Sequence, residues 1–339
     1  NLMFLPGPER SAQWHNEVQR LAETTRLGIP VTLSSDPRHA AGMNPGAGIK
    51  QKGFSQWPGQ LGLAAAGDEA LVEAFGAVGR EEVKALGIRT VLNPMADVAT
   101  EPRWGRIGGT FGADHDTAAR LTAAYVAGFQ GGRDGLTAES VSCMVKHFPG
   151  CGPVESGHEP HFAFGARQVY PGGRFDDHLA SFRAGIEAGA RQIMLSYGIP
   201  IGQTSKDVAM AFNKDIVTDV LRGDLGFDGV VCTDWMCHET EKIFGFLTMK
   251  EASAWGVEHL SVPDRYEKSL DAGVDQFGGQ SDPSHIVELV RSGRVTEDRI
   301  DESARRTLRT KFELGLFEDR YVDETAAAKR TGTAEFRER

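Results

Sequence analysis

Short apolar runs alternate with longer amphipathic stretches along most of the chain, and this alternation predicts its secondary structure. Buried parallel strands appear as short apolar runs, whereas amphipathic helices repeat their apolar residues every three to four positions. We predict strands at residues 31–33, 90–92, 142–145, 192–195, 230–232 and 274–277. Helices are predicted at residues 11–27, 68–86, 114–129, 176–188, 214–221, 266–272, 286–292 and 297–314. Strands that alternate with helices in this way are typical of an α/β fold built on a parallel sheet.

Polar residues follow several of the predicted strands at the point where the apolar run ends. These residues are Asp36, Lys146, His147, Tyr197 and Asp234. The carboxyl ends of parallel strands point to one face of a barrel or a doubly wound sheet, so we expect the five side chains to converge there. Four of them also have a structural interpretation: Asp234 can cap the following helix, Lys146 can pair with one acidic group, and His147 and Tyr197 can be satisfied core residues.

The chemistry of this set favours a ligand with many hydroxyl groups. One arginine and two tryptophans from other parts of the chain extend the set: Arg106, Trp104 and Trp235. The charged members can donate to or accept from several hydroxyl groups, and the indole faces are flat apolar surfaces for a sugar ring. Arg106 can alternatively form a surface ion pair worth about 0–1 kcal/mol. Carbohydrate is the predicted ligand class.

Composition and net charge limit the kinds of molecule that the chain is expected to bind. The chain has 339 residues, of which 40% are hydrophobic and 25% are charged, and its formal net charge is −10. This negative charge disfavours nucleic acid, because proteins that bind it neutralise phosphates with basic patches. No apolar run is long enough for a membrane span. Four irregularly spaced cysteines do not form a disulfide framework or a zinc motif, and they leave the cellular compartment open.

Several sequence motifs resemble one enzyme family. They are KHFPG at residues 146–150, EPRWGR at 101–106, GFDGVVCTDW at 226–235, QVYPGGRFD at 168–176 and GVDQFGG at 273–279. These motifs are similar to those of the barrel domain of glycoside hydrolase family 3, in particular its bacterial β-glucosidase-type members. The first three also follow the family's order along the chain, and the resemblance extends from about residue 14 to residue 322.

The resemblance implies a TIM-like (β/α)8 barrel, which we expect in an incomplete or distorted form. It implies a retaining, exo-acting hydrolase that removes terminal non-reducing β-D-glucosyl residues. Asp234 matches the family's nucleophile, which forms a covalent glycosyl-enzyme intermediate. By the same match, the residues that contact the sugar or lie beside it are Asp36, Arg106, Lys146, His147, Tyr197 and Trp235. Hydrolysis by paired carboxyl groups needs neither a metal ion nor an organic cofactor, so we expect none.

The resemblance also implies a division into domains. We assign residues 1–322 to the barrel domain and residues 323–339 to a linker toward a C-terminal α/β sandwich domain that we expect outside this chain. In most two-domain members that second domain supplies the acid/base glutamate, and we expect the same here. Members that act on N-acetylglucosaminides use an Asp-Ser/Thr-His triplet after the Lys-His-Phe motif, and residues 151–161 lack it. The remaining candidates within this chain are Glu155, His158, Glu159 and Glu239.

These observations favour a β-glucosidase that acts on β-linked oligosaccharides or on aryl or alkyl glucosides. A β-xylosidase, a β-N-acetylhexosaminidase and a sugar-binding barrel without catalytic activity are the alternatives. An unrelated barrel enzyme that forms a Schiff base on Lys146 is a further alternative, since a fold alone does not fix a function. We expect no nucleic-acid or membrane partner, and association into a homo-oligomer stays open.

Overall fold

The computed structural model of the chain describes residues 2, 5–36, 39–40, 53–243 and 247–338. Its centre is a parallel sheet of five strands. In spatial order these are β1 (Leu33–Ser35), β2 (Ile88–Val91), β3 (Ser142–Phe148), β5 (Gln192–Leu195) and β7 (Val230–Cys232). The spatial order follows the chain order, as expected when each strand is joined to the next by a crossover helix. The predicted α/β architecture is therefore confirmed, with five of the six predicted strands in place.

The sixth predicted strand, at residues 274–277, is wrong. Its backbone makes a single parallel bridge, between Cys232 and Gln276. The reason lies in Asp275, whose carboxylate accepts the N–H of Val231 at 3.0 Å, in the role that a backbone carbonyl takes in a regular strand. Within the described parts of the chain, the sheet therefore does not continue past this bridge into a closed ring. This agrees with a TIM-like barrel in incomplete form.

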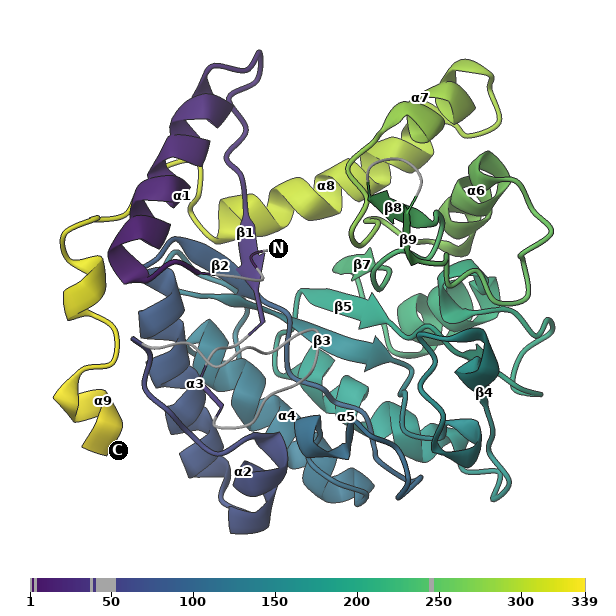
Figure 1. The fold of residues 1–339 in the computed structure, drawn as a ribbon, viewed down its shortest axis with the longest axis horizontal. Helices are drawn as coiled ribbons and strands as arrows, with labels where there is room; N and C mark the ends of the chain where they lie inside the picture. Colours follow the sequence, from purple (N-terminus) through teal and green to yellow (C-terminus); the bar gives the residue numbers. More distant parts are fainter. Residues whose placement is uncertain (1, 3–4, 37–38, 41–52, 244–246, 339) are drawn as a thin grey trace.

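Helices cover the sheet at the predicted places. They are α1 (Pro8–Glu23), α3 (Glu69–Lys84), α4 (His115–Gln130), α5 (Phe175–Glu187), α6 (Val262–Ala272), α7 (Ser284–Arg291) and α8 (Glu297–Glu313). Several begin with a capping side chain: Asp68 accepts the N–H of Ala70 at 2.9 Å, and Asp114 accepts that of Thr117 at 2.8 Å. The stretch predicted as a helix at 214–221 is a π-helix, Asp215–Asp224. In Figure 1, α3, α4 and α5 lie below the sheet and α8 crosses above it.

Several short elements were not predicted. They are α2 (Gln60–Ala66), α9 (Ala334–Glu338), a strand pair β4 (Arg167–Gln168) and β6 (Ile199–Pro200), and an antiparallel hairpin of β8 (Glu241–Ile243) and β9 (Leu247–Lys250). The 3-10 turns are Ile107–Gly109, Glu155–Gly157, Ala163–Gly165, Met210–Phe212 and Ala327–Lys329. Elements of this length carry too few apolar residues to show a period in the sequence.

The main hydrophobic core lies between the sheet and its covering helices. Stacked and edge-on aromatic rings of Phe75, Tyr125 and Phe129 join α3 to α4. A side chain on Gly128 would place its Cβ 2.4 Å from the carbonyl oxygen of Glu73, so only glycine lets these two helices approach so closely. None of the helices in the described ranges is both long and apolar enough to cross a membrane.

The last residues pack against the body of the molecule. Asn16 on α1 donates to the carbonyl of Val322 at 2.9 Å and to the carboxylate of Glu324 at 2.8 Å. Ala327 is fully buried, and the segment that ends in α9 runs beside α1 and α3 in Figure 1. The domain boundary at residue 322 stays a prediction.

Candidate active site

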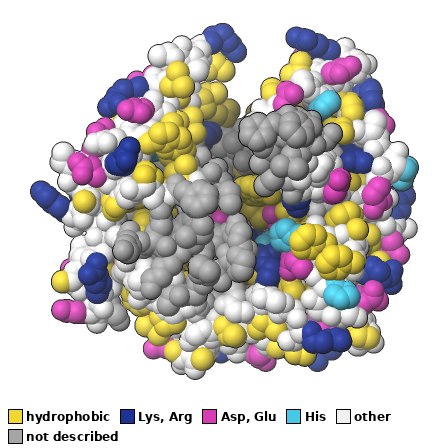
Figure 2. Space-filling view, viewed as in Figure 1, with side chains coloured by type: hydrophobic (Ala, Val, Ile, Leu, Met, Phe, Trp, Pro, Cys, Tyr) yellow, Lys and Arg dark blue, Asp and Glu magenta, His cyan; other side chains and the backbone are white. Residues whose placement is uncertain are grey.

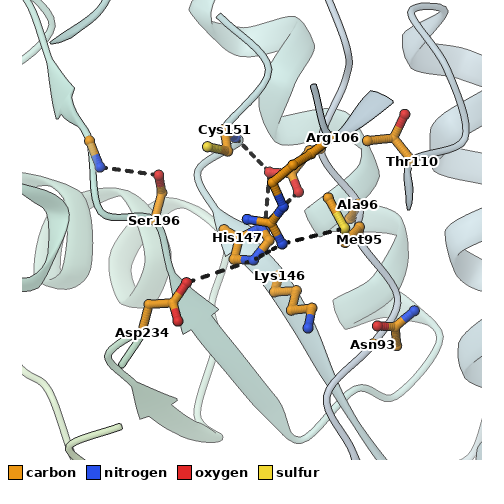
Figure 3. A network of polar contacts seen from close by, with 12 residues as sticks. Asn93, Met95, Ala96, Arg106, Thr110, Lys146, His147, Cys151, Ser196 and Asp234 are labelled. Atoms are coloured by element: carbon orange, nitrogen blue, oxygen red, sulfur yellow. Dashed lines mark hydrogen bonds and ion pairs between the residues drawn. The ribbon is translucent and has the colours of Figure 1, made fainter. Parts of the chain in front are cut away.

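The five polar residues predicted to converge all lie at the carboxyl edge of the sheet. Asp36 follows β1, Lys146 and His147 lie in the last three residues of β3, Tyr197 follows β5 and Asp234 follows β7. All five are buried. Figure 3 shows Asp234, Lys146 and His147 side by side, with the guanidinium of Arg106 reaching over them from the loop after β2. Parallel strand order is what brings together residues that are up to two hundred positions apart.

Lys146 and Asp36 form a buried ion pair. The Lys146 ammonium donates to Oδ1 of Asp36 at 2.8 Å. Lys146 therefore has the acidic partner that it would need if its role were purely structural. The same pair also offers a carboxylate oxygen and ammonium protons to hydroxyl groups of a ligand.

His147 is oriented by a residue that sequence reasoning missed, Asp97. The ring Nδ1 of His147 lies 2.9 Å from Oδ2 of Asp97, and Oδ1 of Asp97 accepts the backbone N–H groups of His147 and Cys151. On the other side of the ring, Nη2 of Arg106 lies 3.3 Å from Nε2. A guanidinium can only donate, so Nε2 accepts and Nδ1 carries the proton given to Asp97. Burial lowers the pKa of His147, which agrees with this neutral form.

Asp234 is buried and yet is held in its ionised form. Burial alone would raise the pKa of Asp234, but nearby positive groups outweigh burial and lower it: the rings of His147 and His161 when they are protonated, and the N–H of Trp235 and the guanidinium of Arg106 in either case. The N–H of Trp235 donates to Oδ1 at 2.7 Å, and Oδ2 lies 3.7 Å from Nε2 of His147. Arg106 and the backbone N–H of Trp235 lower the pKa of Asp234 whether or not His147 is protonated. An ionised carboxylate that faces hydrogen-bonding groups such as His147 and Arg106 is suited to nucleophilic attack.

Tyr197 closes the site on the side of β5. Its hydroxyl donates to the carbonyl of Trp235 at 2.7 Å, which fixes the residue that follows Asp234. Burial, and secondarily the charge of Asp234, raise the pKa of Tyr197 well above its ordinary value, so the phenol stays protonated. Lys250 on the unpredicted β8–β9 hairpin donates to the same carbonyl at 2.7 Å, with its ammonium 4.2 Å from the centre of the Tyr197 ring.

A second group of residues lies on the loop after β3, where sequence reasoning named Glu159 as an acid/base candidate and missed His161. Glu159 accepts the indole N–H of Trp104 at 2.8 Å, lies 3.6 Å from Arg106 and accepts a short hydrogen bond from His161. The His161 ring lies 4.3 Å from the Tyr197 ring, measured between centroids. Trp104 itself is almost fully buried, so the prediction that its face is open to a sugar is wrong. Trp235 is half-buried, and its contact with a sugar stays a prediction.

Three of the four in-chain candidates for the acid/base are held by other charged or polar side chains. Burial would raise the pKa of Glu159, but His161 and Arg106 outweigh it and lower the pKa, which opposes a protonated acid at this position. Glu155 pairs with Arg167 at 2.9 Å, and Glu239 accepts the hydroxyl of Tyr266 at 2.5 Å. Among the described residues, no group of three or more His, Cys, Asp or Glu side chains can hold a metal ion.

Comparison with known proteins adds a family to this geometry. The family model described as the Glycosyl hydrolase family 3 N terminal domain matches residues 5–310. The chain is 49% identical over 326 residues to the probable beta-glucosidase C of Aspergillus flavus, across 96% of this chain and 51% of that protein. It is 41% identical over 344 residues to a periplasmic beta-glucosidase/beta-xylosidase of Dickeya chrysanthemi, across 98% of this chain and 53% of that protein.

Solved structures show the same likeness. A β-glucosidase from Erythrobacter marinus superposes with a TM-score of 0.79 at 27% identity, across 99% of this chain and 41% of that one. A mutant beta-glucosidase from Listeria innocua in complex with laminaribiose superposes with a TM-score of 0.77 at 27% identity, across 98% of this chain and 42% of that one. The chain spans about half the length of the curated relatives it matches.

Proposed function

From the premise that this chain belongs to glycoside hydrolase family 3, we propose that it forms the catalytic barrel of a retaining β-glucosidase with Asp234 as its nucleophile. One observation carries the proposal: a buried carboxylate whose pKa is lowered stands at the end of β7, beside groups that can hold sugar hydroxyls. A site that only binds sugar has no need of an ionised carboxylate in this position. The β-glucosidase names of the relatives support the same reaction class.

The proposed reaction has two displacement steps. In the first, an oxygen of Asp234 bonds to the anomeric carbon, the bond to the leaving oxygen breaks, and an acid protonates that oxygen. In the second, water replaces Asp234 at the same carbon, gives its proton to the same acid/base and restores the carboxylate. The β configuration is retained because the carbon is inverted twice.

The remaining side chains act by holding the sugar in place. Asp36, Lys146, Arg106 and His147 surround the site with charged and ring hydrogen-bonding groups, which we assign to the hydroxyls of the glucosyl unit. Hydrogen bonds of this kind contribute to catalysis when they strengthen as the ring distorts toward the oxocarbenium-like transition state. Tyr197 fixes the backbone after Asp234, and Trp235 is assigned to one side of the sugar.

The acid/base is proposed to come from the part of the longer protein that the relatives possess and this chain does not span. Glu159 supports this assignment, because its pKa is lowered by His161 and Arg106 against the effect of burial. The substrates proposed are β-linked oligosaccharides and aryl or alkyl β-glucosides. Laminaribiose, bound in the Listeria relative, belongs to the first class.

The proposal is tested with a 2-deoxy-2-fluoro-β-D-glucoside that carries a dinitrophenyl leaving group. The fluorine slows hydrolysis of the intermediate, and the activated leaving group makes an acid nearly unnecessary, so the experiment tests the nucleophile alone. Intact-mass spectrometry should show one added deoxyfluoroglucosyl unit. The adduct should be absent from Asp234→Asn and present in Glu155→Gln, which removes an exposed carboxylate from the loop after β3. Glucose binding without an adduct in the wild type would instead support the non-catalytic barrel.

A further inference from the structure

The loop after β3 carries two aromatic side chains that the proposed reaction does not use. Phe162 and Phe164 are 55% and 69% exposed, which is unusual for phenylalanine. Their rings are stacked, with centroids 5.3 Å apart and planes 7° apart, and the ring of His158 packs edge-on against Phe164. Exposing two large apolar rings together opposes the hydrophobic effect, so such a pair marks a surface that binds something.

The backbone under this pair is fixed by hydrogen bonds. The indole N–H of Trp255 donates to the carbonyl of Pro160 at 2.9 Å, and the N–H of Gly165 donates to the carbonyl of Phe162 at 2.9 Å. A Cβ on Gly165 would lie 2.2 Å from the carbonyl oxygen of Glu159, so the loop curls too tightly for any other residue there. The two rings are therefore presented by a pre-organised loop, which reduces the entropy lost when a ligand binds.

The pair is continuous with the candidate active site. On the same loop, Glu159 pairs with Arg106, and His161 packs against Tyr197. The side chains of Glu159 and His161 are 24% and 32% exposed, against 11% for Asp234. The loop after β3 therefore carries the two residues that contact Arg106 and Tyr197 and, directly after His161, the two exposed rings. Figure 2 shows hydrophobic side chains gathered next to histidine and charged side chains on this face of the molecule.

We propose that Phe162 and Phe164 form the binding surface for an apolar leaving group, the alkyl or aryl aglycone of a β-glucoside. The inference rests on the proposed function. If the glucosyl unit occupies the buried polar end of the site, the group attached through its anomeric oxygen extends outward along this loop. A sugar face can also stack on phenyl rings, but these rings give its hydroxyl groups no partner, so an aryl or alkyl group, which has no hydroxyl to leave unpaired, is favoured there.

The test measures binding without turnover. Methyl 1-thio-β-D-glucoside and 2-phenylethyl 1-thio-β-D-glucoside share the sugar, resist hydrolysis and differ in the apolar group. Isothermal titration calorimetry on the wild type should show the phenylethyl compound binding about tenfold more tightly, as expected for one aromatic group withdrawn from water. In the double variant Phe162→Ala/Phe164→Ala this ratio should fall to about 2 or less, while the affinity for the methyl compound stays within about twofold.

A matched control removes another exposed, stacked phenylalanine. Phe312 is 57% exposed and stacks on Phe317 at 4.1 Å, at the end of α8. The variant Phe312→Ala should keep the full tenfold ratio. A ratio that persists in the double variant, or an equal affinity for both compounds in the wild type, overturns the aglycone surface and leaves the proposed function standing. Failure of the wild type to bind either compound contradicts the sugar site itself, and the inference falls with it.

Discussion

Two buried aspartates on neighbouring segments of the barrel have opposite surroundings. Asp275 accepts hydrogen bonds from Arg222 at 2.7 Å, Arg306 at 3.0 Å, Ser303 at 2.7 Å and the N–H of Val231 at 3.0 Å. Asp234, which follows β7 only three residues after Val231, accepts one backbone N–H at 2.7 Å and faces an imidazole nitrogen at 3.7 Å. The first carboxylate has its oxygens saturated by the protein, as a structural group does. The second is kept ionised by its surroundings and faces the groups assigned to the sugar, as a reacting group must.

The largest expected difference between them is in stability. Asp275→Asn removes the charge with which Arg222 and Arg306 pair and disrupts a saturated network, so it should lower the free energy of unfolding by about 3 kcal/mol, the lower end for a broken buried ion pair. Asp234→Asn should change that free energy by less than about 1 kcal/mol, because it breaks no saturated network. Urea unfolding of both variants, followed by circular dichroism, checks the contrast. Equal losses in the two variants would show that Asp234 is a structural group like Asp275.

The pH dependence of kcat/KM tests the ionised state of Asp234. Its pKa lies below the ordinary value, so kcat/KM for an activated aryl glucoside should stay level from about pH 7 to about pH 5 and fall only as the carboxylate protonates. Arg106→Gln removes one cause of the lowered pKa and should move this acid limb to higher pH. An unmoved limb would mean that Arg106 does not act on Asp234.

The same lowered pKa has a consequence for stability. Because the folded pKa of Asp234 lies below the unfolded one, the ionised group adds stability at pH values above the unfolded pKa. That contribution disappears as the pH falls through the folded pKa. Acid unfolding of Asp234→Asn should lack this component when it is compared with the wild type.

The smallest effect is expected at Arg103, three residues before Arg106. Arg103 belongs to the same EPRWGR motif, but it pairs with Glu101 at 2.8 Å on the surface. Exposed ion pairs contribute little. Arg103→Ala should therefore change neither the kcat/KM for the activated glucoside nor the midpoint of thermal unfolding measurably. A loss of activity comparable to that of Arg106→Gln would show that the whole motif, and not the one buried guanidinium, serves the site.

The sequence predicted the strand ends better than it predicted the loops. Asp234 and Lys146 could be found because each follows an apolar run, and a polar residue at the end of a buried strand departs from the apolar pattern. Asp97, Glu159 and His161 carry no such signal. Their contacts with His147, Arg106 and Tyr197 exist only once loops from different strands are folded together.

The errors in the predicted fold have a similar origin. The apolar pattern at residues 274–277 fits a strand, but the Asp275 side chain takes over a strand hydrogen bond, which no period in the sequence reveals. The indole of Trp104 is turned inward to Glu159, although its motif suggested a surface for sugar. In both cases a single side chain forms a hydrogen bond with a group far away in the chain, and this tertiary contact outweighs the local sequence pattern.

Chemical rescue tests the central claim, that Asp234 is the nucleophile, most directly. Asp234→Ala removes the carboxylate and leaves room for a small anion, and a dinitrophenyl β-glucoside needs little acid assistance. With azide added, the variant should recover turnover and release α-glucosyl azide, because a single displacement inverts the anomeric carbon. If azide restores no turnover while the folded variant still binds glucose, or if the azide product has the β configuration, Asp234 is not the group that attacks the sugar.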